Sequence, residues 1–315
     1  MRLATRTLGA TGLDVTKLGV GTSPLAGMAQ LYGYDVTEDQ GVATIEAVFD
    51  SAIRFLDTSN GYGAHGEAET RIGRAIAARG GLPGDLVLAT KVDPDPLTGD
   101  FSGARVFASY EESLARLGVD RVPLLYLHDP ERIRIQDAIA PDGPVRALVR
   151  LREEGRVDHL GVAGGPVDVL GGYLGTGEFE VVLSHNRYTL LDRSAEQFFA
   201  SARERGIGVV NAAPYGGGML AKGPQVQSKY GYGERDGRVA EAARAMELAC
   251  ERYQVPLAAA ALQFSMRGAA VDSTVVGVSS PKRVAQTLEY AACEIPEALW
   301  EELDALTPAP EYWMH

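Results

Sequence analysis

Eight short apolar segments recur along this chain, and most of them are followed by a segment with helical periodicity. We interpret the apolar segments as buried β-strands because each is short and stops at a polar or glycine-rich turn. Strands that alternate with helices form parallel sheets, and eight such strands are typical of a closed (β/α)8 barrel. The predicted strands are residues 17–22, 54–57, 86–90, 122–127, 157–163, 179–183, 207–211 and 273–276.

The segment before the first strand predicts a small β-hairpin, because residues 5–16 alternate polar and apolar positions around two glycines. A doubly wound open sheet is the main alternative to the barrel. Such a fold usually has a GxGxxG turn that opens a helix after its first strand, whereas this chain reads GVGTSPLAG there. We therefore expect one α/β domain over residues 1–315, a (β/α)8 TIM barrel with an N-terminal β-hairpin.

Helical spacing of apolar residues, together with start and stop signals, predicts the helices between these strands. Thr37 begins a capping-box-like sequence, and Gly118, Gly155 and Gly206 follow three of the helical segments as stop signals. The predicted helices are residues 37–52, 67–78, 104–117, 143–154, 194–205, 238–253, 257–267, 281–292 and 296–306.

Composition limits the kinds of partner. Lysine and arginine total 30 against 42 acidic residues, so the formal net charge is −12. Such a chain is repelled by nucleic-acid phosphates and by acidic membrane surfaces, and no apolar run is long enough for a membrane span. The two cysteines, Cys250 and Cys293, have no metal-type spacing, and the N-terminus does not resemble a signal peptide. We expect a cytoplasmic protein without a metal site.

Polar residues stand at the C-terminal ends of three successive predicted strands. Asp57 ends the second strand and Tyr62 follows five residues later, Lys91 ends the third strand, and His128 ends the fourth. The C-terminal ends of barrel strands carry the active sites of this fold, so we expect these four side chains to share one cavity.

These four residue types suit proton transfer to or from a carbonyl or alcohol oxygen. A tyrosine has an ordinary pKa of about 10, and we expect the cationic Lys91 to lower the pKa of Tyr62, with Asp57 holding the lysine charged. His128 is expected to bind the substrate oxygen as a neutral donor. None of them can carry a hydride, so a redox reaction would require a nicotinamide or similar carrier.

Other interpretations remain open at this point. Each of the four residues alone has an ordinary structural role, such as a strand-end cap or a hydrogen-bonded core histidine. A glycosidase would need paired carboxylates, which only Asp57 with Asp93 or Asp129 could supply. The five histidines include no HxxxH pair, which disfavours a zinc enzyme.

Over nearly its full length the chain resembles the aldo-keto reductase family. The resemblance rests on LGVGT, RFLDTSNGYG, VLATKVD, LLYLHDP, GVAGGP, NAAPYGGGMLAKG and VVGVSSPKRVAQTLE. It implies a barrel that binds NAD(P)(H) without a Rossmann domain. It also implies that Tyr62 is the general acid/base, that Lys91 and Asp57 tune it, and that His128 orients the carbonyl.

The resemblance also implies a set of cofactor contacts from several loops. Asn186 has the position that holds the nicotinamide carboxamide, and glycines in the loop 213–220 would let backbone amides approach the pyrophosphate. Ala163 and Gly164 replace a common Ser-Asn pair, and Ala212 replaces a tyrosine that stacks on the nicotinamide. The implied contacts are Gly21, Thr22, Asp57, Asn186, Ala213, Pro214, Gly216, Gly218, Leu220, Gly277, Ser279, Ser280, Arg283 and Thr287.

The adenosine end of the implied site bears on the choice between NAD and NADP. Many members that prefer NADPH carry lysine at the Gly277 position, so that anchor is absent here. Arg283 is retained and would bind a 2′-phosphate or stack on adenine. The pattern favours NAD, or the use of both cofactors.

Within the family, the LHDP strand end, the loop after the first strand and NAAPYGGGML are most similar to bacterial aldose 1-dehydrogenases. This subgroup includes L-fucose, D-threo-aldose and galactose dehydrogenases and a related pyridoxal 4-dehydrogenase. The resemblance implies oxidation of a cyclic hemiacetal to a lactone, and Tyr32, Tyr34 and Tyr188 are expected to line the sugar pocket. An NADPH-dependent carbonyl reductase, a pyridoxal 4-dehydrogenase and a non-catalytic cofactor-sensing subunit are the alternatives, and the oligomeric state is left open.

Overall fold

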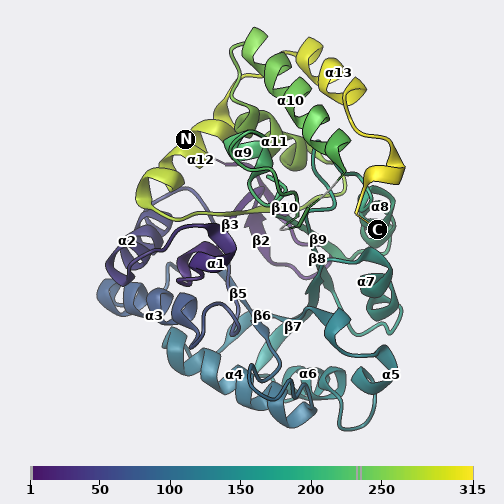
Figure 1. Cartoon of the computed structure of the whole chain (residues 1–315). Helices are drawn as coiled ribbons and strands as arrows, with labels where there is room; N and C mark the ends of the chain where they lie inside the picture. The colour runs from purple at the N-terminus through teal and green to yellow at the C-terminus, as the bar shows by residue number, and fades with distance from the viewer. Residues whose placement is uncertain (1–2, 232, 235, 315) are drawn as a thin grey trace.

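Eight parallel strands form a closed barrel in the computed structural model, which describes residues 3–231, 233–234 and 236–314 (Figure 1). Each strand pairs with the next one along the chain, and the last pairs with the first to close the ring. The predicted (β/α)8 barrel is therefore confirmed. Its strands are β3 (Leu18–Gly21), β4 (Phe55–Asp57), β5 (Val87–Val92), β6 (Val122–His128), β7 (Val157–Gly164), β8 (Val181–His185), β9 (Gly208–Ala212) and β10 (Ser273–Gly277).

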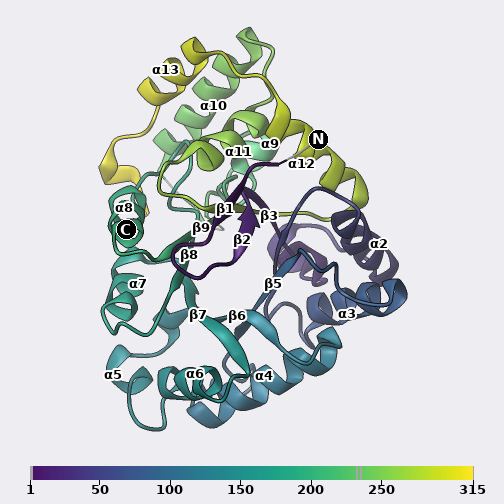
Figure 2. The ribbon, with the colours of Figure 1, turned by 180° about the vertical axis from the view of Figure 1, so that it is seen from behind.

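The predicted hairpin is present and covers the N-terminal end of the barrel. Strands β1 (Thr5–Thr7) and β2 (Asp14–Thr16) pair antiparallel, and Figure 2 shows them in front of the barrel when it is viewed from behind. Leu8 and Val15 belong to the same buried cluster as the barrel interior. A Cβ at Gly9 would lie 2.2 Å from the backbone nitrogen of Gly208, so only glycine allows this close approach.

The helices surround the barrel as a ring (Figure 1). Thr37, Ser102 and Ser280 cap helix N-termini through their side chains, as Ser, Thr and Asp commonly do. The helices are α1 (Ala29–Tyr32), α2 (Glu38–Phe49), α3 (Glu67–Arg79), α4 (Gly103–Leu117), α5 (Ile135–Ala138), α6 (Pro144–Glu153), α7 (Val167–Leu174), α8 (Glu196–Glu204), α9 (Met219–Lys222), α10 (Gly237–Arg252), α11 (Leu257–Arg267), α12 (Pro281–Ala292) and α13 (Glu297–Ala305), and the short 3-10 turns are Ser23–Leu25, Pro130–Arg132 and Pro310–Tyr312. Among the described helices, none combines the length and the apolar character that a membrane crossing requires.

Helix α7 is a helix that the sequence did not predict. Its sequence VDVLGGYL contains the adjacent glycines Gly171 and Gly172, which are poor helix formers. The helix nevertheless buries Leu170, Tyr173 and Leu174 completely or almost completely. Packing against the barrel therefore outweighs the local preference of the chain.

Two sets of buried side chains hold the barrel together. The larger set lies between the strands and the helices, and a smaller set fills the barrel interior. Side chains two residues apart on a strand point to the same side. Phe55, Ala89 and Tyr126 lie in the interior set, so the residues two positions later lie on the same side at the C-terminal end of the barrel. Those residues are Asp57, Lys91 and His128.

Candidate active site

Lys91 occupies the centre of the site at the C-terminal end of the barrel. Its ammonium nitrogen Nζ donates to Asp57 Oδ1 at 2.6 Å, to the backbone oxygen of Thr58 at 2.6 Å and to the hydroxyl of Tyr62 at 3.2 Å. The Lys91 side chain is only 1% exposed. A buried ammonium group needs such partners, because an unpaired charge is very costly away from water. The structure therefore brings together three of the four predicted side chains.

The backbone of Asp57 is held in place by Thr22, the residue that follows β3. Its backbone oxygen accepts hydrogen bonds from the amide of Thr22 at 3.0 Å and from the Thr22 hydroxyl at 3.1 Å. Burial raises the pKa of the Asp57 carboxyl, and the adjacent Lys91 ammonium opposes that rise. The second carboxylate oxygen, Oδ2, is buried and has no hydrogen-bond partner among the described residues.

Tyr62 differs from the sequence-based expectation in its acidity. Burial raises the pKa of the Tyr62 phenol well above its ordinary value, and the negative charges of Asp57, Asp93 and Asp129 raise it further. The expectation that Lys91 lowers this pKa is therefore wrong for the protein without ligand. The physical reason is that desolvation and several carboxylates together oppose a phenolate more than one ammonium favours it. At neutral pH Tyr62 is a proton donor.

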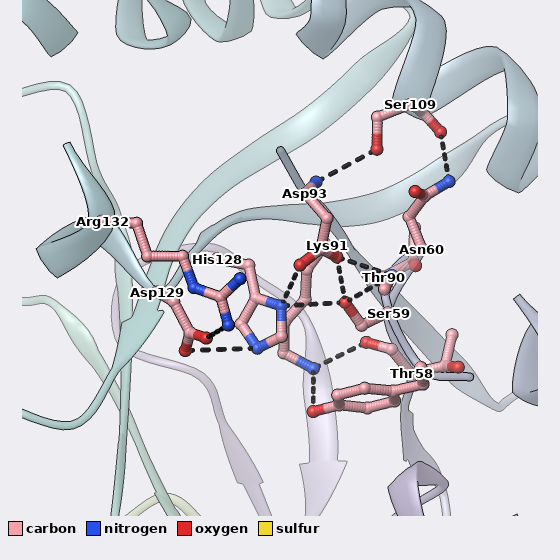
Figure 3. Close-up of polar contacts among 12 residues, drawn as sticks. Thr58, Ser59, Asn60, Thr90, Lys91, Asp93, Ser109, His128, Asp129 and Arg132 are labelled. Carbon is pink, nitrogen blue, oxygen red and sulfur yellow. Dashed lines mark hydrogen bonds and ion pairs between the residues drawn. The ribbon is translucent and has the colours of Figure 1, made fainter. Parts of the chain in front are cut away.

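His128 lies between two carboxylates, as Figure 3 shows. Its Nδ1 atom is 2.7 Å from Asp93 Oδ1 and 3.0 Å from the Ser59 hydroxyl, whereas Nε2 is 3.6 Å from Asp129 Oδ1. The His128 ring also packs edge-on against the Tyr62 ring, with 5.6 Å between the ring centroids. The fourth predicted side chain thus stands beside the other three.

The loop after β4 is tied to helix α4, which fixes Tyr62. The Asn60 side chain donates to the backbone oxygen of Ser109 at 3.1 Å and to Glu112 Oε2 at 3.1 Å. The amide of Gly61 donates to Asp93 Oδ2 at 2.8 Å, and the amide of Tyr62 donates to the oxygen of Ser59 at 3.2 Å. Tyr62 therefore sits on a loop that several buried contacts hold in one shape.

Asp93 and Ser59 are site residues that the sequence reasoning missed. The sequence alone indicates Asp93 only as a possible glycosidase carboxylate, and it gives Ser59 no separate role. The available signal was spacing, because Asp93 follows Lys91 by two residues and so continues the same side of β5. The glycosidase pairing of Asp57 with Asp93 has no support in the contacts, since these two carboxylates bind Lys91 and His128 respectively.

A cavity of about 1130 Å³ opens over these residues, and Asp57, Tyr62, Lys91 and His128 all line it. Tyr32 and Tyr34 from the loop after β3 also line it, as predicted. Tyr188 does not, because its ring packs in the core against Phe199 and Phe264 at centroid distances of 5.8 and 5.1 Å. The remaining polar lining includes Asp93, Asn60, Arg105, Asp129, Glu131, Arg132 and His185.

The implied cofactor contacts divide into two groups. One group lines the cavity: Gly21, Asp57, Ala213, Gly218, Gly277, Ser279, Arg283 and Thr287. The other group lies behind or beside its wall: Thr22, Asn186, Pro214, Gly216, Leu220 and Ser280. The positions of the first group fit the resemblance, and the cofactor roles of both groups stay predictions.

The loop 213–220 uses several of its own amides. The amide of Gly216 donates to the oxygen of Ala213 at 3.0 Å, and the amides of Gly218 and Leu220 both donate to the oxygen of Tyr215 at 3.1 Å. Gly216 and Gly218 have φ values of 58° and 101°, which this tight turn requires. These amides could bind a pyrophosphate only after the turn rearranges.

Asn186 is fully buried next to the cavity, and His185 lines the wall in its place. Asn186 Nδ2 lies 3.0 Å from His185 Nδ1, and the amide oxygen Oδ1 has no hydrogen-bond partner among the described residues. Burial lowers the pKa of His185 to about 4, so this ring stays neutral. The sequence reasoning did not single out His185, although it ends β8 as His128 ends β6.

Residues 17–308 match the family model described as the aldo/keto reductase family. This chain belongs to the aldo/keto reductase family. This aldo/keto reductase is 33% identical to a D-threo-aldose 1-dehydrogenase of Pseudomonas sp over 96% of its own length and 97% of that protein. It is 31% identical to a pyridoxal 4-dehydrogenase of Microbacterium luteolum, with 95% and 96% covered, and to an L-galactose dehydrogenase of Arabidopsis thaliana, with 91% and 88% covered.

A solved structure of the family has the same fold. The aldo-keto reductase AKR11C1 from Bacillus halodurans, in a holo form, is 25% identical and superimposes with a TM-score of 0.78 over 98% of this chain and 97% of that one. The resemblance drawn from the motifs is therefore confirmed. This aldo/keto reductase is an NAD(P)-dependent oxidoreductase that uses a nicotinamide cofactor and acts on a small molecule.

Proposed function

We propose that this enzyme oxidises the C1 hemiacetal of an aldose to a lactone, with an L-fucose or D-threo-aldose type of sugar as substrate. The observation that carries the proposal is the Tyr62 hydroxyl on the cavity wall, 3.2 Å from Lys91 Nζ. The similarity to a D-threo-aldose 1-dehydrogenase along almost the whole chain supports the choice of a sugar. The many charged and hydroxyl groups that line the cavity also suit a polyhydroxylated substrate.

In this proposal Tyr62 is the general acid/base of the reaction. As the phenolate it accepts the proton of the hemiacetal hydroxyl during oxidation, and as the phenol it donates a proton during reduction. Lys91 holds a hydrogen bond to the phenol oxygen, and Asp57 keeps the ammonium charged and oriented. His128 binds the substrate oxygen at the edge of the same cavity.

The residues present fit a nicotinamide cofactor. Asp57 lines the cavity, its Oδ2 atom is a buried acceptor without a described partner, and a sugar hydroxyl of the cofactor would satisfy it. When bound, the cofactor supplies the hydride acceptor and, in its oxidised form, a positive charge. That charge would favour the Tyr62 phenolate, whose formation the carboxylates of this site oppose.

The adenosine end of the cavity supports the use of NAD or of both NAD and NADP. Arg283 lines the cavity beside Ser279 and Thr287, near the N-terminus of α12. A guanidinium group there can bind a 2′-phosphate or stack on adenine. Gly277 offers no second cation, and a Cβ at this position would lie 2.7 Å from Pro24 Cγ.

A panel of assays tests the proposed reaction. We expect NAD-linked oxidation of L-fucose or D-arabinose to proceed faster than NADPH-linked reduction of an aromatic aldehyde. Pyridoxal belongs in the panel because one relative is a pyridoxal 4-dehydrogenase. Turnover in the aromatic aldehyde assay alone would instead support the second candidate, an NADPH-dependent carbonyl reductase. Nucleotide binding without any turnover would support a non-catalytic cofactor-sensing subunit.

The single-domain organisation over residues 1–315 and the cytoplasmic location stay predictions from the sequence.

A further inference from the structure

The two ring nitrogens of His128 have unequal partners. Nδ1 lies 2.7 Å from Asp93 Oδ1, which is a hydrogen-bond distance, and Nε2 lies 3.6 Å from Asp129 Oδ1, which is too long for one. Figure 3 shows Asp93 and Asp129 on opposite sides of the ring. Asp93 is therefore the carboxylate that is hydrogen-bonded to the imidazole.

Asp93 is an ionised acceptor. Its Oδ2 atom receives a hydrogen bond from the Ser59 hydroxyl and another, at 2.8 Å, from the Gly61 amide. Burial opposes the charge, but His128, Ser59 and the Gly61 amide together lower the pKa of Asp93 to about 2. An ionised carboxylate can only accept hydrogen bonds, so the hydrogen in the Asp93–His128 contact belongs to Nδ1 of the imidazole.

We propose that Asp93 is a positioning residue that keeps a hydrogen on Nδ1 of His128, so that Nε2 is the ring atom that meets the substrate oxygen. A neutral His128 then accepts a hydrogen bond from a sugar hydroxyl other than the C1 hydroxyl, whose hydrogen goes to Tyr62, and a protonated His128 donates one to a substrate carbonyl. This inference rests on the proposed oxidoreductase reaction for its consequence, but the position of the hydrogen can be measured without any turnover. The sequence predicts that a neutral His128 donates a hydrogen bond to the substrate oxygen. A neutral ring with its hydrogen on Nδ1 has none on Nε2, so this inference replaces that prediction.

The surroundings of His128 determine at which pH the ring changes between these two states. Burial lowers the pKa of His128, but the charges of Asp93 and Asp129 outweigh burial and raise it. The Lys91 ammonium acts in the opposite direction. The ring is therefore protonated over a wider pH range than an ordinary histidine. The groups that face it are Asp93 and Lys91 from β5, Ser59 and Tyr62 from the loop after β4, Asp129 after β6 with its partner Arg132, and His185 at the end of β8.

The Asp93→Asn variant should move the hydrogen of the neutral His128 ring from Nδ1 to Nε2, for a geometric reason. The donors Ser59 and Gly61 both point at Oδ2, so the amide oxygen of the new side chain would take that position. Its NH₂ group would then face Nδ1 of His128 and require a bare nitrogen there. The hydrogen of the neutral ring would move to Nε2.

Nitrogen-15 NMR of the full chain, labelled at its histidine side chains, tests the inference directly. The chain has five histidines, and the His128→Gln variant identifies the signal of interest. Above the pKa of His128 we expect the wild-type ring to carry its hydrogen on Nδ1, and the Asp93→Asn ring to carry it on Nε2. The matched control is Asp129→Asn, which removes a neighbouring charge near Nε2 and should leave the hydrogen on Nδ1. A wild-type ring with its hydrogen on Nε2 would overturn the inference, even if Asp93→Asn does not fold.

The pH profile of sugar oxidation supplies the second readout. With wild-type enzyme, kcat/KM should rise with pH as His128 loses its proton. In Asp93→Asn this rise should move to lower pH, and the plateau should fall on the order of 10- to 100-fold, as expected for a lost charge-assisted hydrogen bond. An unchanged profile with the hydrogen still on Nδ1 would overturn the role of Asp93. If no sugar is oxidised but the hydrogen positions are as expected, the proposed substrate is wrong and the positioning role of Asp93 stands.

Discussion

The ammonium nitrogen of Lys91 lies 3.2 Å from the hydroxyl oxygen of Tyr62, below the mouth of the cavity. The same nitrogen is 4.7 Å from the centre of the Tyr62 ring, so the lysine touches both the polar end and the face of the phenol. This contact joins the strand β5 to the loop after β4. It places a proton donor whose pKa burial has raised beside an ammonium group that can stabilise its phenolate.

Replacing Tyr62 with phenylalanine should abolish turnover and spare cofactor binding. The ring and its packing against His128 are retained, while the hydroxyl that transfers the proton is lost. Removal of a general acid/base costs about 10²- to 10⁴-fold in kcat. Steady-state kinetics and fluorescence titration with NADH measure the two properties. Tyr253→Phe, at the exposed end of α10, is the control, and a Tyr62→Phe enzyme as active as this control would refute the proposed role.

The buried pair of Lys91 and Asp57 should stabilise the fold only as a pair. Both side chains are at most 4% exposed, and the Asp57→Asn variant leaves the ammonium without its counterion. Breaking a buried pair by removing one partner costs about 3–5 kcal/mol in the free energy of unfolding. The double variant Asp57→Leu with Lys91→Met should recover most of this loss while remaining inactive. Urea unfolding measures the free energy of unfolding of Asp57→Asn and of the double variant. An Asp57→Asn protein as stable as wild type would contradict the expectation.

The barrel, most of its helices and the four catalytic candidates could be predicted from sequence because the information is local. Apolar strands with a period of two and polar residues at their ends fix which side chains meet, as for Asp57, Lys91 and His128. Helix α7 could not be predicted, since tertiary packing overrides the preference of its two glycines.

The pKa values in the site could not be predicted from the sequence. The pKa of Tyr62 depends on how many carboxylates surround it and on how deeply it is buried, and both follow only from the tertiary structure. The same holds for Asn186 and His185, which are adjacent in the chain but differ in which of them reaches the cavity. Asn186 has a φ of 63°, a left-handed conformation that asparagine adopts more readily than most residues, but the sequence does not fix at which residue the end of β8 turns.

Gly61 should be intolerant of a methyl group. A Cβ at this position would lie 2.7 Å from Cγ and from Oδ1 of Asp93, closer than real Cβ atoms come to other groups. The Gly61→Ala variant must displace the carboxylate that holds His128, so we expect a loss of about 1–3 kcal/mol in stability together with a loss of activity. Gly84→Ala, where a Cβ meets nothing within 4 Å, is the matched control and should change stability by less than about 0.5 kcal/mol. Thermal unfolding and kcat/KM measure both, and equal behaviour of the two variants would contradict this reading of Gly61.

The contribution of Asp93 to stability should depend on pH with a defined sign. A carboxyl whose pKa falls from 3.8 to about 2 on folding stabilises the native state by about 2 kcal/mol, fully present above pH 4 and lost as the pH falls toward 2. The raised pKa of His128 makes stability depend on pH in the opposite direction. The contribution of His128 to stability is present below about pH 6.5 and is lost as the pH rises through the pKa of the folded state. Urea unfolding of wild type and Asp93→Asn should therefore differ most between about pH 4 and 6.5. A difference that does not change with pH would show that the pair contributes through packing alone.

Arg283 should discriminate NADP from NAD. It lines the cavity at the N-terminus of α12, where its guanidinium is a donor for a 2′-phosphate. Among the described residues, its side chain hydrogen-bonds only to the neutral Gln286. A hydrogen bond to a charged group contributes about 1.5–3 kcal/mol, so Arg283→Gln should raise KM for NADP by about 10- to 100-fold and leave KM for NAD nearly unchanged. Lys282→Gln removes the same charge from the adjacent, exposed position and serves as the control. An equal rise in KM for both cofactors would mean that Arg283 stacks on the adenine and does not bind the phosphate.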